Sequence, residues 1–133
     1  MTTVEQSAES MTEYERTYAG WADQVCNVRH DVAEHLDKCP AADDAVLVVS
    51  EFATNAILHS RSRGRHFRIR VQRYRNHVRV ECQDASGVWR GRRRDDDRLH
   101  GLAVVEALTG GPAGWGVQTT SDGGRIVWAR LTW

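Results

Sequence analysis

Two alternating segments constrain the fold of this chain more than any other feature. In residues 66–74, HFRIRVQRY, and residues 77–84, HVRVECQD, apolar side chains alternate with polar ones, and only Arg75 and Asn76 lie between the segments. A period of two is typical of a strand with one buried face, and a two-residue connection joins neighbouring antiparallel strands. The sequence therefore predicts a β-hairpin whose apolar face must be covered by another layer. The side chains of that face are Phe67, Ile69, Val71, Val78, Val80 and Cys82.

Helices that could form this covering layer are predicted on both sides of the hairpin in the sequence. Two aspartates suit the first turn of a helix over about 42–60, and a further helix is predicted at 101–110 between glycines at both ends. A first helix, which ends before Pro40, follows from apolar residues at helical spacing. These residues are Trp21, Val25, Val28, Val32 and Leu36.

The remaining segments complete an α+β pattern. Residues 12–20 predict a short strand, and residues 115–121 and 125–133 predict a final hairpin around Asp122-Gly123-Gly124. The order β-α-α-β-β-α-β-β predicts a two-layer sandwich in which a mixed, mostly antiparallel sheet carries three helices on one face. We expect residues 1–11 to be a disordered tail and residues 12–133 to form one domain.

Composition excludes several classes of protein. Hydrophobic residues make up 41% of the chain, and no apolar run approaches the ~20 residues of a membrane helix. The polar, acidic N-terminus predicts no signal peptide, so we expect a cytoplasmic protein without a membrane partner. Cys26, Cys39 and Cys82 have no metal-ligand spacing and are odd in number, which argues against a disulfide framework.

Charge is unevenly distributed although the formal net charge is zero. Residues 1–60 carry three basic and eleven acidic side chains, whereas residues 61–94 carry twelve basic and two acidic ones. A basic segment of this kind is typical of nucleic-acid binding or of an acidic protein partner. However, alternation alone forces the arginines of 66–84 onto the outer face, and Tyr74 is the one aromatic residue there for stacking, so we predict no nucleic-acid partner.

A polar stripe interrupts the otherwise apolar segment VVSEFATNAILHS, residues 48–60. Glu51, Asn55 and His59 are four residues apart, so they lie on one side of the predicted helix. A solvated helix face and a functional edge explain this pattern equally well when the helix is considered alone. Buried polar groups would require partners, because unpaired ones are costly.

Two later segments favour the functional interpretation. DASG, residues 84–87, follows the predicted end of a strand, and HGLAVVEAL, residues 100–108, places a glycine at a helix start, where free N–H groups favour phosphate. Together with the stripe, this ordered set resembles the histidine-kinase-like (GHKL, Bergerat-fold) ATPases. More narrowly, the chain is similar over residues 12–133 to the small actinobacterial anti-sigma factors and serine kinases of that superfamily.

The resemblance implies roles for the residues of the stripe and of the first glycine motif. Glu51 matches the glutamate that acts as general base or orients it, and Asn55 matches the asparagine that binds Mg²⁺ through its side-chain oxygen. Asp84 matches the aspartate that accepts a hydrogen bond from the exocyclic amine of adenine. Ser86 and Gly87 complete that adenine pocket.

The same resemblance implies roles for residues elsewhere in the chain. His100, Gly101 and Leu102 match the second glycine motif, which surrounds the phosphates, and residues 88–99 match the lid over ATP. Arg29 matches an arginine of the first helix that lies near the γ-phosphate and the partner surface, although an ordinary exposed arginine explains it nearly as well. His59 is expected to form part of the wall of the pocket.

Two positions depart from the family pattern. Leu99 stands where relatives have a glycine two residues before the Gly101 position, and Ile126 stands where relatives often have a threonine. Both changes predict weaker nucleotide affinity or turnover, because one removes backbone freedom and the other removes a hydroxyl group.

The resemblance implies an anti-sigma factor that binds Mg-ATP, sequesters a sigma factor and phosphorylates a STAS-domain anti-anti-sigma partner on serine, and it leaves a homodimer open. The alternative is a module of the same fold that binds partners without transferring phosphate. Glu51 and Asn55 favour the kinase, whereas Leu99 and Ile126 favour the alternative. A nucleic-acid-binding role for the arginine-rich hairpin is the third hypothesis.

Overall fold

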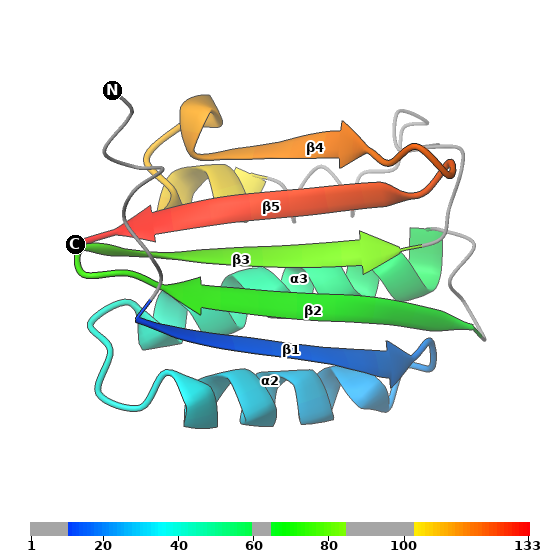
Figure 1. Cartoon of the computed structure of the whole chain (residues 1–133), viewed down its shortest axis with the longest axis horizontal. Coiled ribbons are helices and arrows are strands. Elements are labelled where there is room, and N and C mark those ends of the chain that lie inside the picture. Colours follow the sequence, from blue (N-terminus) through cyan, green and yellow to red (C-terminus); the bar gives the residue numbers. More distant parts are fainter. Residues whose placement is uncertain (1–10, 60–64, 85–102) are drawn as a thin grey trace.

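The computed structural model describes residues 11–59, 65–84 and 103–133 and follows the predicted order of elements (Figure 1). Besides a helix at 103–108 and a short 3₁₀ turn at Pro112–Gly114, it contains two long helices and five strands. None of the described helices is long and apolar enough to cross a membrane. The long helices and the strands are β1 (Thr12–Ala19), α2 (Gln24–His35), α3 (Ala42–His59), β2 (His66–Arg73), β3 (His77–Asp84), β4 (Trp115–Thr119) and β5 (Arg125–Thr132).

The strands form one sheet with the order β1-β2-β3-β5-β4. The α+β sandwich is confirmed, but the sheet, which we expected to be mixed, is antiparallel at each described pairing. Two helices connect β1 to β2 and return the chain to the end where β1 finished, so β2 runs antiparallel to β1 (Figure 1). β3 and β4 do run in the same direction, but β5 lies between them, which leaves no parallel pair.

The helices lie on one face of the sheet, and the core fills the space between the two layers (Figure 1). The alternation predicted for residues 66–84 is confirmed, because every second residue of β3, and of β2 up to Val71, is buried and the residues between them are not. Burial of these side chains, each worth about 1.5–3 kcal/mol, holds the helices on the sheet. The largest fully buried side chains include Tyr18, Leu36, Phe52, Phe67, Ile69 and Leu131.

The first helix begins later than the sequence pattern predicted. Trp21 was expected to lie on its apolar side but precedes the helix, and its side chain is 56% exposed. The chain has to reverse direction after β1. Backbone hydrogen bonds from the Gly20 N–H to the Arg65 carbonyl and from the Trp21 N–H to the Ala19 carbonyl fix the residues of that turn. The predicted glycine end of helix 103–108 is confirmed by Gly111, whose N–H donates to the Glu106 carbonyl at 2.9 Å.

Candidate functional site

The polar stripe lies along the border between the buried and exposed sides of α3. Glu51 and Asn55 are both half-buried. One turn of the helix separates them, so their side chains project in nearly the same direction. Exposed residues such as Leu58 lie on one side of the stripe, and the buried residues Val48 and Phe52 lie on the other. The stripe is thus a polar edge next to the core, with access to solvent.

Asp84 lies at the end of β3 on the side of the sheet that faces the helices. It is in phase with the buried residues Val80 and Cys82, and its own exposure is 4%. α3 and β3 run in the same direction (Figure 1), and the Cys82 thiol donates a weak hydrogen bond to the Phe52 carbonyl at 3.9 Å. Because α3 rises about 1.5 Å per residue, Asn55 and Asp84 lie beyond this contact at the same end of the two layers.

Asp84 is held by a residue that the sequence reading missed. The Nη2 and Nε atoms of Arg125 donate to Asp84 Oδ2 at 2.8 and 3.3 Å. The two residues lie directly opposite each other on β3 and β5, and the exposure of their side chains is 2% for Asp84 and 6% for Arg125. The one signal in the sequence that could have identified this arginine is the alternation of its strand, because residue 125 shares a face with buried Val127 and Ala129.

The turn between β4 and β5 lies against the main chain of Asp84. A Cβ atom added to Gly124 would lie 3.0 Å from the Asp84 carbonyl oxygen and 2.9 Å from the Thr120 hydroxyl. The carboxylate of Asp122 accepts hydrogen bonds from the Thr120 hydroxyl and from the Gly124 N–H, and the pKa of Asp122 is lowered mainly by the hydroxyl. The turn therefore brings the start of β5 close to the end of β3.

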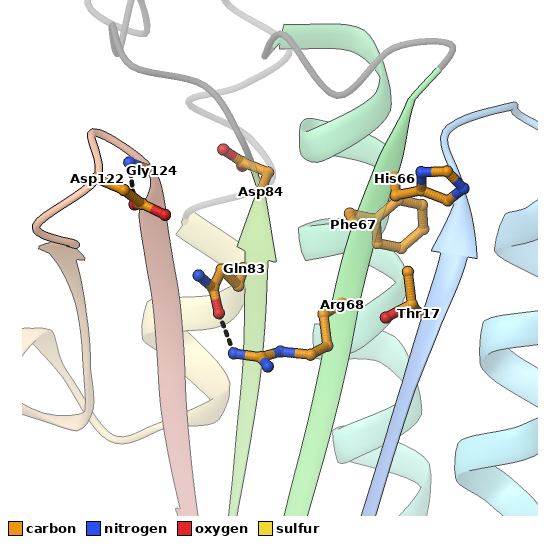
Figure 2. A pocket seen from close by; sticks show the side chains of 8 residues that line it. All are labelled: Thr17, His66, Phe67, Arg68, Gln83, Asp84, Asp122 and Gly124. Atoms are coloured by element: carbon orange, nitrogen blue, oxygen red, sulfur yellow. Dashed lines mark hydrogen bonds between the residues drawn. The ribbon is translucent and has the colours of Figure 1, made fainter.

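A shallow depression of about 320 Å³ opens at the same strand ends, but on the face of the sheet without helices. Figure 2 shows it from close by, with Asp122 and Gly124 of the turn near Asp84 and a hydrogen bond from Arg68 to Gln83. Glu51 and Asn55 lie on the opposite side of the sheet. The depression is therefore separate from the polar edge, and Asp84 lies at the boundary between them. It is lined by Thr17, His66, Phe67, Arg68, Gln83, Asp84, Asp122 and Gly124.

Ile126 belongs to this open face and not to the polar edge. It pairs with Gln83 and Gln118 across the sheet, on the face opposite Arg125. The threonine that relatives often carry at this position would likewise point away from α3. The expectation that Ile126 removes a hydroxyl from the pocket is therefore not supported, because residue 125 is the one that faces the polar edge.

Comparison with solved structures identifies the fold. A structure of the RsbU and RsbW domains of Rv1364c from Mycobacterium tuberculosis matches 92% of this chain with a TM-score of 0.65 and 18% identity. One chain of the SiaB–SiaC complex from Pseudomonas aeruginosa matches 96% of it with a TM-score of 0.58 and 12% identity. The chain has the fold of these proteins. The fold expected from the resemblance to the GHKL ATPases is thus confirmed.

The matches differ in how much of each solved chain they cover. The present chain spans 32% of the Rv1364c chain and 93% of the matched chain from the SiaB–SiaC complex. No family model matches the sequence, and no curated protein matches it significantly. The likeness lies in the three-dimensional arrangement, since identities of 18% and 12% are too low to carry residue roles.

Most of the remaining predicted site residues lie outside the part of the chain that the structure describes. His59 is the last residue of α3, but its side chain is not described. Arg29 is exposed on α2, two residues before Asp31 and therefore on nearly the opposite side of that helix. The other predicted residues, which lie in the undescribed range 85–102, are Ser86, Gly87, Leu99, His100, Gly101 and Leu102.

A second polar cluster, which the sequence reading did not identify, joins α2 to β1. Asp31 Oδ2 accepts hydrogen bonds from the Tyr18 hydroxyl at 2.8 Å and from Arg16 Nη1 at 2.7 Å. The Tyr14 hydroxyl lies 2.6 Å from the Tyr18 hydroxyl and 3.2 Å from the same carboxylate oxygen. Burial raises the pKa of Tyr18 well above its usual range. Because one carboxylate of α2 binds side chains of β1 in this way, the cluster is a structural connection between helix and strand.

Proposed function

We propose that this protein is an anti-sigma regulatory factor that binds Mg-ATP and phosphorylates a serine of a STAS-domain antagonist. The observation that carries the proposal is the placement of Glu51 and Asn55 on a half-buried helix edge, at the same end of the layers as buried Asp84. The shared fold with an RsbW domain supports it. In the family that the sequence resembles, these three positions hold the general base, the magnesium ligand and the adenine acceptor.

The donor set of the polar edge fits Mg²⁺. This ion prefers oxygen ligands and is usually held by one or two protein groups together with waters and substrate phosphates. The side-chain oxygen of Asn55 suits such a site because it is half-buried and lies on a regular helix. Bound Mg²⁺ would neutralise negative charge on the phosphates.

Glu51 would then act on the protein substrate. A carboxylate one helical turn from the magnesium ligand can accept the proton of a serine hydroxyl, provided that the hydroxyl approaches within hydrogen-bonding distance. Its partial exposure allows a partner protein to deliver that hydroxyl from solvent. We therefore assign proton acceptance to Glu51 and nucleotide positioning to Asn55 and Asp84.

Partner binding is assigned to the helical side of the molecule, where Arg29 is exposed on α2. The open face of the sheet is less suited to a polyanion because two of its central arginines are paired with carboxylates. Arg68 pairs with Glu15 at 3.0 Å, and Arg70 pairs with Glu13 at 2.8 Å. These pairs support protein recognition over nucleic-acid binding, since phosphate contacts would have to compete with them.

The experiment that tests the proposal combines the protein with labelled ATP, Mg²⁺ and candidate STAS-domain proteins. The proposal predicts a stable complex and label on the STAS protein. Glu51→Ala is expected to retain the complex and lose the label, whereas Asn55→Ala is expected to lose nucleotide binding as well. Arg70→Ala, on the open face, serves as the matched control and is expected to behave like the wild type. Unchanged labelling by Glu51→Ala would remove this residue from catalysis.

A module that binds partners without phosphoryl transfer is the second candidate. Leu99, which stands where the family pattern has a glycine near the phosphates, favours it. The two candidates differ in one readout of the same experiment. The second predicts a complex with the STAS protein, or with a sigma factor, without any transferred label.

A further inference from the structure

The buried ion pair between Asp84 and Arg125 differs from the other described ion pairs of this chain. Its two side chains are 2% and 6% exposed, whereas in each of the others at least one partner is more than a quarter exposed. Exposed pairs contribute about 0–1 kcal/mol, but removing one partner of a buried pair costs about 3–5 kcal/mol. The pair thus fixes both side chains firmly.

Stability alone does not explain why an ion pair occupies this place. Well-packed apolar residues of similar volume often stabilise a core as well as a buried ion pair does, because both charges must be desolvated. Next to the pair along both strands, the facing core positions are apolar, with Cys82 opposite Val127 and Val80 opposite Ala129. The change from apolar to ionic occurs where β3 ends and β5 begins, which is where the nucleotide base is expected.

The geometry of the pair restrains the carboxylate. Two N–H groups of one planar guanidinium donate to the same oxygen of Asp84, which restrains the position of that oxygen. The main chain of the same residue pairs with Arg125 in the β3–β5 ladder, and Gly124 packs so closely that an added Cβ atom would lie 3.0 Å from the Asp84 carbonyl oxygen. The final hairpin therefore positions Asp84 through its side chain and its backbone together.

We propose that Arg125 is a positioning residue for nucleobase recognition, which holds the Asp84 carboxylate so that the site selects a base with an exocyclic amine over one with a carbonyl oxygen. The inference rests on the proposed nucleotide site. It adds that the base is recognised by an ion pair whose two residues come from β3 and β5. A purely structural ion pair would support the fold but would leave base selectivity unchanged when it is altered.

The experiment measures the affinities for ATP and for inosine triphosphate, which carries a carbonyl oxygen in place of the amine. Arg125→Lys is the principal variant, because lysine keeps the positive charge but has no planar group with two parallel donors. The wild type is expected to prefer ATP, and in Arg125→Lys this preference should fall by about fivefold to tenfold, mainly through weaker ATP binding. Arg70→Lys, which makes the same change on the open face, should leave both affinities unchanged.

Arg125→Met serves as the second variant and should lose the preference almost completely. Because Arg125→Met leaves a buried carboxylate without its partner, its folding is checked by circular dichroism. If Arg125→Met is unfolded, Arg125→Lys decides the question. A wild-type ratio of the two affinities in Arg125→Lys would overturn this inference while leaving nucleotide binding intact. A wild-type protein that binds neither nucleotide would overturn the proposed nucleotide site and this inference together.

Discussion

Removing a single hydroxyl group from the connection between α2 and β1 should produce a measurable loss of stability. In Tyr18→Phe the ring would remain in place, where it is 2% exposed and stacks on Phe67 with ring centroids 5.7 Å apart. The variant would lose the 2.8 Å hydrogen bond from the hydroxyl to the Asp31 carboxylate and the 2.6 Å hydrogen bond between the hydroxyls of Tyr18 and Tyr14. Hydrogen bonds to charged groups contribute about 1.5–3 kcal/mol, so we predict a decrease of about 2 kcal/mol in the free energy of unfolding.

The assay is urea unfolding followed by tryptophan fluorescence. A decrease of about 2 kcal/mol corresponds to a midpoint lower by about 1 M urea with an unchanged m-value, and to a Tm lower by roughly 6–12 °C. Tyr14→Phe is the matched control, because its half-buried hydroxyl lies 2.6 Å from the Tyr18 hydroxyl but 3.2 Å from the carboxylate. It leaves the 2.8 Å bond from Tyr18 to Asp31 in place, so its effect should be smaller. A Tyr18→Phe protein within about 0.5 kcal/mol of the wild type would refute the role given to Asp31.

Three further predictions concern pH, the final hairpin and the open face. Burial lowers the pKa of His35 in the folded protein, so the unfolded chain binds the proton preferentially and stability should decline as pH falls below about 6.5. In urea titrations about one pH unit above and below this value, His35→Gln should flatten the decline. Gly124→Ala should lower both stability and ATP affinity, because its methyl group would press on the Asp84 carbonyl oxygen, whereas Gly123→Ala, with a φ of 91° and open space around it, should lower stability alone. Ile126→Thr should leave ATP affinity unchanged in calorimetry, because this side chain lies on the open face; a clear gain would contradict that placement.

The sheet and the long helices were predictable because each has a strong period. Alternation in residues 66–84 placed the apolar side chains correctly, since a one-residue shift would have exposed the whole set. The start of α2 was less predictable. Trp21 fits the helical spacing, but the turn after β1 takes up the residues around it, and a local pattern carries no information about where the preceding strand ends.

The candidate site was predictable only where a motif marked it. Glu51, Asn55 and Asp84 were predicted because they belong to an ordered set with a known family pattern, and their roles stay predictions. Arg125 was missed because it is one arginine among many, and its burial depends on the pairing of β3 with β5, which lie 41 residues apart at the ion pair. The placement of Ile126 on the open face was not predicted for the same reason, because only the strand register shows which neighbour faces α3.

The most direct test of the account is a calorimetric titration of the protein with Mg-ATP. If the polar edge of α3 holds the nucleotide through magnesium, the wild type should bind Mg-ATP, and Asn55→Ala should weaken binding by about tenfold or more. Leu58→Ala is the matched control, because Leu58 is 54% exposed on the same helix, and it should bind as the wild type does. Absence of binding to the wild-type protein, or equal affinity in Asn55→Ala, would contradict the account.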